Sequence, residues 1–534
     1  MTSNQIHSNS CLYKDDYMEA EYTYSTCIVA ETKKDDKHSF SANETQRPSR
    51  FHVENITRKL IFRTERLKGR LGVMLVGLSG NNASTMIAGI YANKLKLSWK
   101  TKTGVKEPNY FGSMMLASTT KIGLDQHTKK EVFAPISNLL PLCHPEDWVF
   151  GGWDINNASV GDSMRRAQVL DIQLQDQLYP YLKTMNPLPG VYIKDFIAEN
   201  QEERANNILS GTLCEQLLTI RNNIRDFKKI NNVDRVIVLW TATTERFCSL
   251  MPGVNMSAID LLAAIEEGHK EISPSILYAT AAILENASFL NGSPQNTLVP
   301  GVCELAQQKN VFVGGDDFKS GQTKLKSVLV EFLVSAGIKP TSIVSYNHLG
   351  NNDGQNLSSF PQFRSKEISK SNVVDDMVES NKILYKNSKD YPDHCVVIKY
   401  VPNVGDSKRA MDEYVSEIFL NGLNTIVIHN TCEDSLLAAP IMIDLILLTE
   451  LFERIFVRNA TATETEDTQF VRFHPILSTL SYLLKAPLVP QGAPVINALT
   501  AQRSCIINIL RACVGLPAEN HMLLEHKIPF LMQK

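Results

Sequence analysis

The sequence predicts an α/β protein with a largely parallel sheet, on three observations. Short apolar strands alternate with helical stretches along most of the 534 residues. One strand, 73–76, runs directly into a glycine turn and a helix. Hydrophobic residues make up 43% and charged residues 21% of the chain, as in ordinary globular proteins. At roughly 150 residues per domain, the length predicts about three domains.

The elements are expected in the following order. Residues 1–65 are polar and weakly periodic, which predicts an arm that either packs on another subunit or is partly mobile. A strand at 73–76 and a helix at 84–94 come next. Further strands are expected at 236–239, 311–313, 343–345, 396–400 and 425–428. Further helices are expected at 258–267, 324–336 and 411–420, and a surface loop at 461–467.

The most apolar stretch, 435–452, predicts a buried core helix. It is interrupted by Pro440, and Asp444 lies at its middle, where a bilayer would make an unpaired carboxylate costly. No apolar run in the first fifty residues resembles a secretory signal. The ten cysteines contain no CxxC pair, which favours reduced thiols. We therefore expect a cytoplasmic protein that does not bind a membrane.

The charge balance argues against a dedicated nucleic-acid binder. Lys and Arg number 54 against 57 Asp and Glu, for a net charge of −3. A strongly basic surface is thus missing from the totals, although a local anion site stays open.

A first candidate anion site is the turn from Gly77 to Thr85. A glycine turn at a helix start suits a pyrophosphate, because the backbone can approach closely and free N–H groups point at the anion. Ser79 stands where the second glycine of G-x-G-x-x-G is expected. The segment by itself fits either a dinucleotide turn or a plain strand-to-helix turn.

Two further segments carry basic and hydroxyl groups. Residues 315–324 precede an apolar helix and fit either a phosphate cradle or an ordinary N-cap with solvated lysines. In residues 364–372, Lys366 and Lys370 would share one face of a helix, where like charges repel unless an anion lies between them. A solvated basic face is the alternative. His348, in the preceding loop 345–354, is not assigned a catalytic role.

Together these segments resemble the eukaryotic myo-inositol-1-phosphate synthase (inositol-3-phosphate synthase) family, over nearly the whole chain after the arm. The residues that carry the resemblance are 108–113, 152–157, 291–297, 315–326, 345–354, 365–371, 405–408, 432–435 and 484–487.

The resemblance implies an NAD-dependent, redox-neutral isomerisation of D-glucose 6-phosphate to 1L-myo-inositol 1-phosphate, by oxidation, enolisation, intramolecular aldol cyclisation and reduction. It implies a homotetramer, with an arm (1–65), a Rossmann-type NAD-binding domain (66–324), a central α+β catalytic and tetramerisation domain (325–434) and a C-terminal segment (435–534) that completes the NAD-binding domain. Use of an activating cation, ammonium or a divalent metal, is left open.

The resemblance also implies three sets of site residues. The catalytic set is Lys366, Lys370, Lys408, Lys485, Asp317, Asp353, Asp406 and Asp434. The cofactor set is Gly77, Ser79, Gly80, Asn81, Asn82, Asp154, Thr241, Ala242, Thr244 and Gly292. The set around the substrate phosphate is Ser320, Gly321, Gln322, Thr323 and Asn351.

Departures from the family pattern gather at the dinucleotide. Ser79 and Ala83 occupy glycine positions, and Thr243 replaces a usual Asn. Ala83 is a mild change, whereas the Cβ of Ser79 is expected to crowd the pyrophosphate. Two hypotheses follow: an active synthase, or a non-catalytic paralogue that binds a sugar phosphate or serves assembly.

Overall fold

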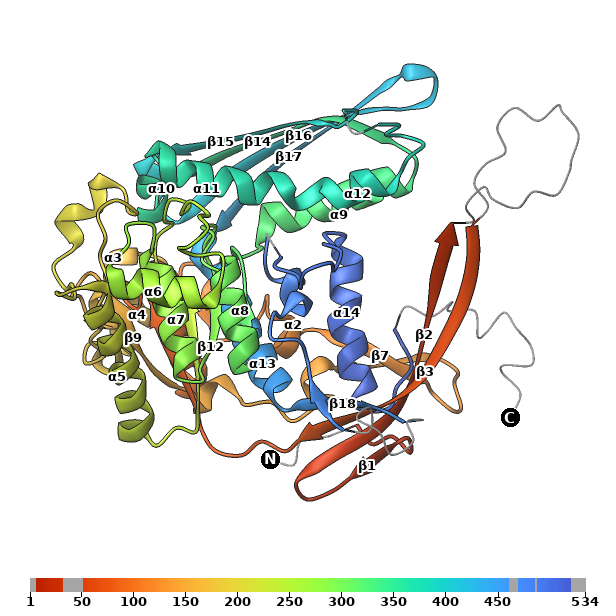
Figure 1. Cartoon of the computed structure of the whole chain (residues 1–534), viewed down its shortest axis with the longest axis horizontal. Coiled ribbons are helices and arrows are strands. Elements are labelled where there is room, and N and C mark those ends of the chain that lie inside the picture. The colour runs from red at the N-terminus through yellow and green to blue at the C-terminus, as the bar shows by residue number, and fades with distance from the viewer. Residues whose placement is uncertain (1–5, 32–50, 388, 461–468, 486, 520–534) are drawn as a thin grey trace, which may run out of the picture. The chain divides into compact units, whose positions relative to one another are not determined.

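The computed structural model describes residues 6–31, 51–387, 389–460, 469–485 and 487–519. The chain forms two compact units (Figure 1). The larger contains Leu67–Glu453 and His474–Ile507, and the smaller contains Met1–Arg66, Arg454–Phe473 and Asn508–Lys534. The loop expected at 461–467 lies outside the described residues.

A six-stranded parallel sheet forms the centre of the larger unit. Its order is β10-β9-β4-β11-β12-β13, with β4 (Leu71–Val76), β9 (Val149–Asp154), β10 (Leu188–Pro189), β11 (Arg235–Trp240), β12 (Ser288–Asn291) and β13 (Val313–Gly314). Every residue of β4 is buried. A continuous apolar run such as Val73–Val76 is typical of a strand covered on both faces.

Helices enclose this sheet. They are α1 (Asn81–Lys94), α3 (Val160–Ala167), α4 (Ile172–Leu182), α5 (Leu213–Asn231), α6 (Ala258–Glu267), α7 (Pro274–Leu284), α8 (Pro300–Lys309) and α13 (Asp434–Glu453). The rings of Trp153 and Trp240 contact Tyr278 of α7 in the core. Two short hairpins, β5 (Trp99–Thr101) with β6 (Gly104–Lys106) and β7 (Thr119–Leu124) with β8 (Glu131–Pro135), and α2 (Met114–Ala117) complete this part.

The apolar stretch predicted as a core helix is α13, which packs against α1. Within the described residues it is the one helix long and apolar enough to span a membrane, and 89% of its apolar window is buried in the protein. Asp444 accepts hydrogen bonds from the Ser113 hydroxyl and from the backbone N–H groups of Met114 and Met115. The carboxylate that argued against a membrane span is therefore satisfied inside the protein.

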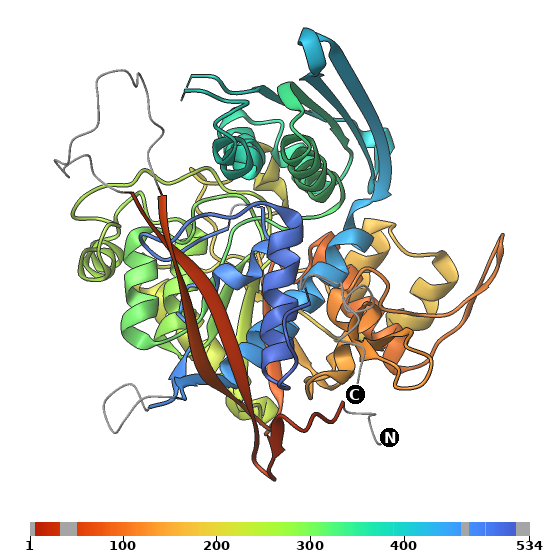
Figure 2. The same cartoon turned by 90° about the vertical axis from the view of Figure 1, so that its right-hand side faces the viewer.

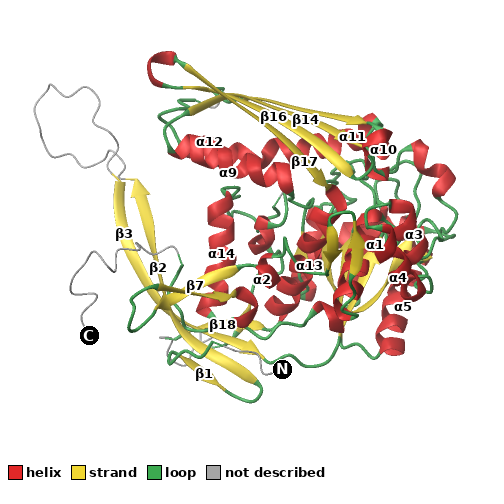
Figure 3. Cartoon of the chain, turned by 180° about the vertical axis from the view of Figure 1, so that it is seen from behind, coloured by secondary structure: helices red, strands yellow, loops and turns green. Residues whose placement is uncertain are grey.

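A second, mixed sheet lies in the same unit, in the order β15-β14-β16-β17. Its strands are β14 (Lys339–Leu349), β15 (Asp393–Tyr400), β16 (Ser407–Glu417) and β17 (Leu423–Glu433). Helices α9 (Gly321–Ser335), α11 (Phe360–Ser371) and α12 (Asp375–Ser380) cover one face, as Figures 2 and 3 show. The short helix α10 (Asn352–Asn356) follows β14. A core that includes Val330, Ile343 and Tyr414 joins the two layers.

Two sequence-based expectations about this sheet are wrong. Residues 411–420 were expected to form a helix but belong mainly to β16, and Ser345–Leu349, expected in a loop, belongs to β14. Met411, Tyr414, Val415 and Ile418 have a spacing that fits a helix. Strand pairing on both sides of β16 overrides that local preference.

In the smaller unit, part of the expected arm forms an antiparallel sheet, for which no strand was predicted. Its order is β1-β2-β3-β18-β19, with β1 (Cys11–Tyr13), β2 (Tyr17–Glu31), β3 (Phe51–Glu65), β18 (Ile455–Asn459) and β19 (Val471–Arg472). Helix α14 (Leu499–Ala512) is the last described helix. The six-stranded parallel sheet and the four-stranded mixed sheet of the larger unit confirm the predicted fold class, an α/β protein with a parallel-sheet domain and a second α+β domain.

Candidate active site

A cavity lies at the carboxyl ends of the parallel strands. It is lined by the residues that end or follow β4, β9, β11 and β12, including Gly77, Asp154, Thr241 and Gly292. In open α/β sheets, ligands bind at this edge. Lys366 of α11, Lys408 of β16 and Lys485 line the same cavity, so the two halves of the candidate site share it.

The glycine turn forms a cradle for an anion. Gly77 has φ of +91°, and a Cβ there would lie 2.7 Å from the backbone N and Cα of Ala242. Only glycine fits such a close approach. Gly80 caps α1 without a side-chain hydrogen bond, and no acidic residue lies in the first turn. Gly80, Asn81 and Asn82 line the cavity, so the start of α1 can meet a pyrophosphate.

The Ser79 side chain points away from the cavity, so the expectation that it crowds the cofactor is wrong. Its hydroxyl donates to the carbonyl of Ala158 at 2.6 Å, and its backbone N–H donates to Asp154 Oδ2 at 2.9 Å. Ser79 is buried and does not line the cavity. The serine therefore joins two loops of the protein and leaves the anion cradle clear.

Asp154 ends β9 and faces the cavity. Its second carboxylate oxygen accepts from the backbone N–H of Asn156 at 2.9 Å. Burial raises the pKa of Asp154, against these hydrogen bonds and the nearby charges of Arg204 and Arg166. Arg204 also lines the cavity but belongs to no motif, so sequence reasoning missed it.

Four more residues of the predicted cofactor set lie at this cavity. Thr241, Ala242, Thr244 and Gly292 all line the cavity. A Cβ at Gly292 would lie 2.1 Å from the Phe318 ring, which also lines the cavity and was not identified from the sequence. The site therefore has the features of a dinucleotide-binding site: a glycine cradle, a helix N-terminus and a carboxylate on the neighbouring strand.

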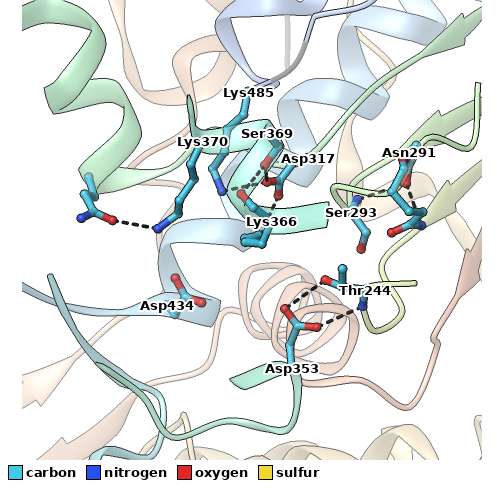
Figure 4. A network of polar contacts seen from close by, with 12 residues as sticks. Thr244, Asn291, Ser293, Asp317, Asp353, Lys366, Ser369, Lys370, Asp434 and Lys485 are labelled. Atoms are coloured by element: carbon cyan, nitrogen blue, oxygen red, sulfur yellow. Dashed lines mark hydrogen bonds and ion pairs between the residues drawn. The ribbon is translucent and has the colours of Figure 1, made fainter. Parts of the chain in front are cut away.

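Asp317 is the centre of the lysine network (Figure 4). It is 2% exposed, and it accepts from Lys366 Nζ at 2.9 Å, Lys485 Nζ at 3.2 Å and the Ser369 hydroxyl at 2.8 Å. Burial opposes its charge, but the two ammonium groups outweigh burial and hold the pKa of Asp317 well below its usual range. This carboxylate is therefore an anchor for two lysines.

The two lysines on Asp317 differ in their proton affinity. Burial opposes the charge on Lys366, but attraction to Asp317 and Asp353 outweighs it and raises the Lys366 pKa. Burial lowers the pKa of Lys485 to about 7, with repulsion from Lys366 and Lys408 acting against the pull of Asp317. Lys366 is a fixed charge, whereas Lys485 can exchange a proton near neutral pH.

Lys370 has only neutral hydrogen-bond partners in the described structure. Its Nζ donates to Asn347 Oδ1 at 2.9 Å and to Gln322 Oε1 at 3.1 Å. Burial, and then repulsion from neighbouring lysines, lowers its pKa well below the usual value. Lys366 and Lys370 do share one helix, as the i, i+4 spacing predicted, but each has its own partners: Lys370 is buried, and the Lys366 side chain is 14% exposed and lines the cavity.

The other carboxylates fall into two groups. Asp434 lies 3.4 Å from Lys408 Nζ, and Asp353 accepts from the Thr244 N–H at 3.0 Å. The pKa of Asp434 is lowered overall, because the charges of Lys408 and the neighbouring lysines outweigh the opposing effect of burial. Asp406 instead accepts from the Ser435 hydroxyl at 2.7 Å and does not line the cavity. Asp406 thus fixes the start of α13, next to Asp434, rather than orienting an amine.

Four of the five expected phosphate residues lie at the start of α9, and the fifth, Asn351, is the N-cap of α10. Ser320 is the N-cap and makes no side-chain cap bond, and both Ser320 and Asn351 line the cavity. Gly321, Gln322 and Thr323 form the first turn but do not line the cavity. The free end of α9 fits an anion.

The lysines around this turn are not solvated. Lys319 is fully buried and donates to Gln502 Oε1 at 2.9 Å, and Lys326 is 2% exposed. The N-cap part of the alternative is confirmed by Ser320, whereas its solvated lysines are wrong for Lys319 and Lys326. His348 is part of β14 and does not line the cavity. Among the described residues, no three His, Cys, Asp or Glu side chains are grouped as metal ligands.

Comparison with known proteins places this architecture in a family. An NAD-binding family model described as myo-inositol-1-phosphate synthase matches residues 71–511. An inositol-3-phosphate synthase of Dictyostelium discoideum is 56% identical over 526 residues, or 98% of this chain and 99% of the relative. Inositol-3-phosphate synthase 1 of Homo sapiens is 57% identical over 523 residues, or 98% of this chain and 90% of the relative.

A solved structure agrees. The crystal structure of inositol-3-phosphate synthase from Caenorhabditis elegans matches with a TM-score of 0.91 and 46% identity, over 98% of each chain. The chain therefore belongs to the NAD-binding myo-inositol-1-phosphate synthase family.

Proposed function

We propose that the protein is an inositol-3-phosphate synthase that converts D-glucose 6-phosphate to 1L-myo-inositol 1-phosphate with NAD. One observation carries the proposal. A single cavity joins a dinucleotide cradle at Gly77–Asn82 to Lys366, Lys408 and Lys485. When bound, NAD accepts a hydride from the sugar and returns it within the same cycle, so the isomerisation has no net oxidation.

The cradle binds and orients the cofactor. The N–H groups at the start of α1 would hold its pyrophosphate, and Asp154 lines the cavity at the end of the neighbouring strand. Thr244 and Gly292, which follow β11 and β12, line the same cavity as the cradle. A cofactor held in the cradle would therefore share this cavity with Asp317, Lys366 and Lys485.

The lysines supply the charge and the proton transfer that the sugar chemistry requires. Enolisation and aldol closure both place negative charge on oxygen, and fixed ammonium groups in a closed site stabilise that charge as it forms. Lys366 and Lys408 are held by Asp317 and Asp434 for this role. Lys485, with a pKa of about 7, is suited to take up and release a proton.

The start of α9 holds the substrate phosphate. Ser320 and Asn351 line the cavity and can donate to phosphate oxygens, and the N–H groups of the first turn add the positive end of the helix dipole. Lys370 is close by through its contact with Gln322. A phosphate bound here would leave the sugar ring beside Lys366.

The alternative of a non-catalytic paralogue loses its main support. It depended on Ser79 blocking the cofactor, and the Ser79 side chain points at Ala158 instead. Lys366 and Lys485 contact Asp317, and Lys408 pairs with Asp434, so three of the four lysines keep a carboxylate partner, while Lys370 contacts two amide oxygens. An active synthase is the function that the geometry favours.

The domain boundaries are part of the proposal. Isolated bridges join Val313 to Ile476 and Phe318 to Leu484. These contacts support a C-terminal segment (435–534) that completes the NAD-binding domain (66–324), around a central domain (325–434) and after an arm (1–65).

We also propose a homotetramer assembled through the second sheet. On the face opposite α9 and α11, exposed apolar side chains alternate along the strands, with Tyr346 44%, Val427 65% and Leu423 69% exposed. Exposed apolar patches mark interaction surfaces. Sedimentation of the wild type as a tetramer, and of Val427→Glu as a smaller species, is expected, and a monomeric wild type would contradict this assembly.

Two further points belong to the proposal. All ten cysteines are free, which supports a cytoplasmic location. Activation by a cation, ammonium or a divalent metal, is tested by assays after chelation and with ammonium added back.

The product of the reaction tests the function directly. Purified protein supplied with glucose 6-phosphate and NAD is expected to form inositol phosphate without stoichiometric NADH. Steady NADH release in proportion to sugar consumed would indicate an ordinary dehydrogenase and refute the proposal. A folded protein that binds glucose 6-phosphate without product would instead support the non-catalytic alternative.

A further inference from the structure

One buried carboxylate, Asp412, contacts the lysine network although no sequence motif includes it. It lies on β16 and is 3% exposed. Its Oδ1 accepts from Gln322 Nε2 at 2.6 Å, and its Oδ2 accepts from the Tyr414 hydroxyl at 3.0 Å. Both donors are neutral, so neither contact is an ion pair. Its charge also attracts the buried amine of Lys326, and this attraction opposes the burial that lowers the Lys326 pKa to about 8.

Asp412 determines which way the amide of Gln322 points. A carboxylate only accepts hydrogen bonds, so the NH2 group of Gln322 must face it and the carbonyl oxygen must face the other way. That oxygen accepts from Lys370 Nζ at 3.1 Å. Asn347 is fixed in the same manner, because its Nδ2 donates to the Val397 carbonyl at 3.2 Å while its Oδ1 accepts from Lys370.

The two amide oxygens are the groups that locate Lys370. Around it lie four other lysines, Lys326, Lys366, Lys408 and Lys485, which repel its charge. Lys326 in turn contacts His394, whose pKa burial lowers to about 3, so that ring is neutral. A reversed Gln322 amide would place N–H groups against the Lys370 amine and remove one of its two acceptors.

We propose that Asp412 is a positioning residue for the isomerisation, which acts by holding Gln322 so that Lys370 stays in place. The order of contact is Asp412 to Gln322 to Lys370. Tyr414 supports the carboxylate from its other side. The inference rests on the proposed role of Lys370 in the reaction, and the experiment below tests that role separately.

A double-mutant cycle tests the inference. In Asp412→Asn the new side chain can present either its amide oxygen or its NH2 group to Gln322, so the Gln322 amide is free to reverse. We expect kcat/KM to fall about 10-fold, as for loss of a hydrogen bond to a charged group. In a Lys370→Ala background the same change should cost less than about 2-fold, because the group it positions is gone.

The outcomes separate positioning from a general structural role. An equal loss in both backgrounds would mean that Asp412 acts independently of Lys370, and this would overturn the inference. Normal kcat/KM in Asp412→Asn would do the same. Normal turnover of Lys370→Ala alone would refute the role of Lys370 and the inference with it, while leaving the synthase activity established.

A milder variant and a control complete the design. Tyr414→Phe keeps the carboxylate but removes one of its donors, and we expect a loss of about 2- to 5-fold that again disappears without Lys370. This cycle decides the matter if Asp412→Asn does not fold. Asp393→Asn neutralises an exposed carboxylate of the same sheet, on β15, and should leave kcat/KM unchanged.

Discussion

Replacing Ser79 by glycine should destabilise the protein and leave its affinity for NAD unchanged. The variant restores the family's usual residue, but the hydroxyl that it removes donates to the partly buried carbonyl of Ala158. Losing that hydrogen bond costs about 0.5 to 1.5 kcal/mol. The greater freedom of glycine in the unfolded chain adds about 0.4 to 1 kcal/mol. The sum is about 1 to 2.5 kcal/mol of stability.

Ser79→Ala is the matched control, because it removes the hydroxyl and keeps the Cβ. The melting temperature should therefore fall in the order wild type, Ser79→Ala, Ser79→Gly. Titration of each apo-protein with NAD, followed by calorimetry, should give dissociation constants within about 2-fold of one another, since no Ser79 atom lines the cavity. Clearly tighter binding by Ser79→Gly than by Ser79→Ala would refute this reasoning, because it would place the Cβ against the cofactor.

Three other changes test the site. Lys366→Ala should lower kcat about 100-fold or more with an unchanged circular dichroism spectrum, as expected when a fixed charge is removed from a developing oxyanion; near-normal turnover would exclude Lys366 from the mechanism. Gly77→Ala should lose NAD binding and stability in a titration and a thermal melt, because its Cβ would lie 2.7 Å from the backbone of Ala242. Burial lowers the pKa of Lys319 to about 7, so this amine binds fewer protons in the folded protein than in the unfolded chain between pH 7 and about 10.5, and its contribution to wild-type stability becomes more favourable as the pH rises across that window. Lys319→Met should consequently raise the melting temperature more at pH 7 than at pH 10, and an equal effect at both would contradict a neutral buried amine.

Much of the site could be predicted from the sequence because its parts are local. The strand, glycine turn and helix at 73–94 lie within one continuous segment, and α1 begins at Asn81 as such a turn requires. Lys366 and Lys370 are four residues apart on one helix, so their common origin follows from helical spacing alone. The longer motifs then indicated the family, which the comparisons confirm.

Contacts between distant segments decided the rest. Residues 411–417 became a strand because β14 and β17 pair with them, although their local spacing also fits a helix. The Ser79 side chain turned towards Ala158, 79 residues away in sequence, and so left the cofactor cradle open. Asp412 reached Lys370 through Gln322, which lies 90 residues earlier. The amino-acid order alone sets which chemical groups the chain carries and which of them are neighbours on one element. Their hydrogen-bond partners and their burial arise only when remote segments meet and exclude water. Those partners and that burial determine where each side chain points and whether it is charged.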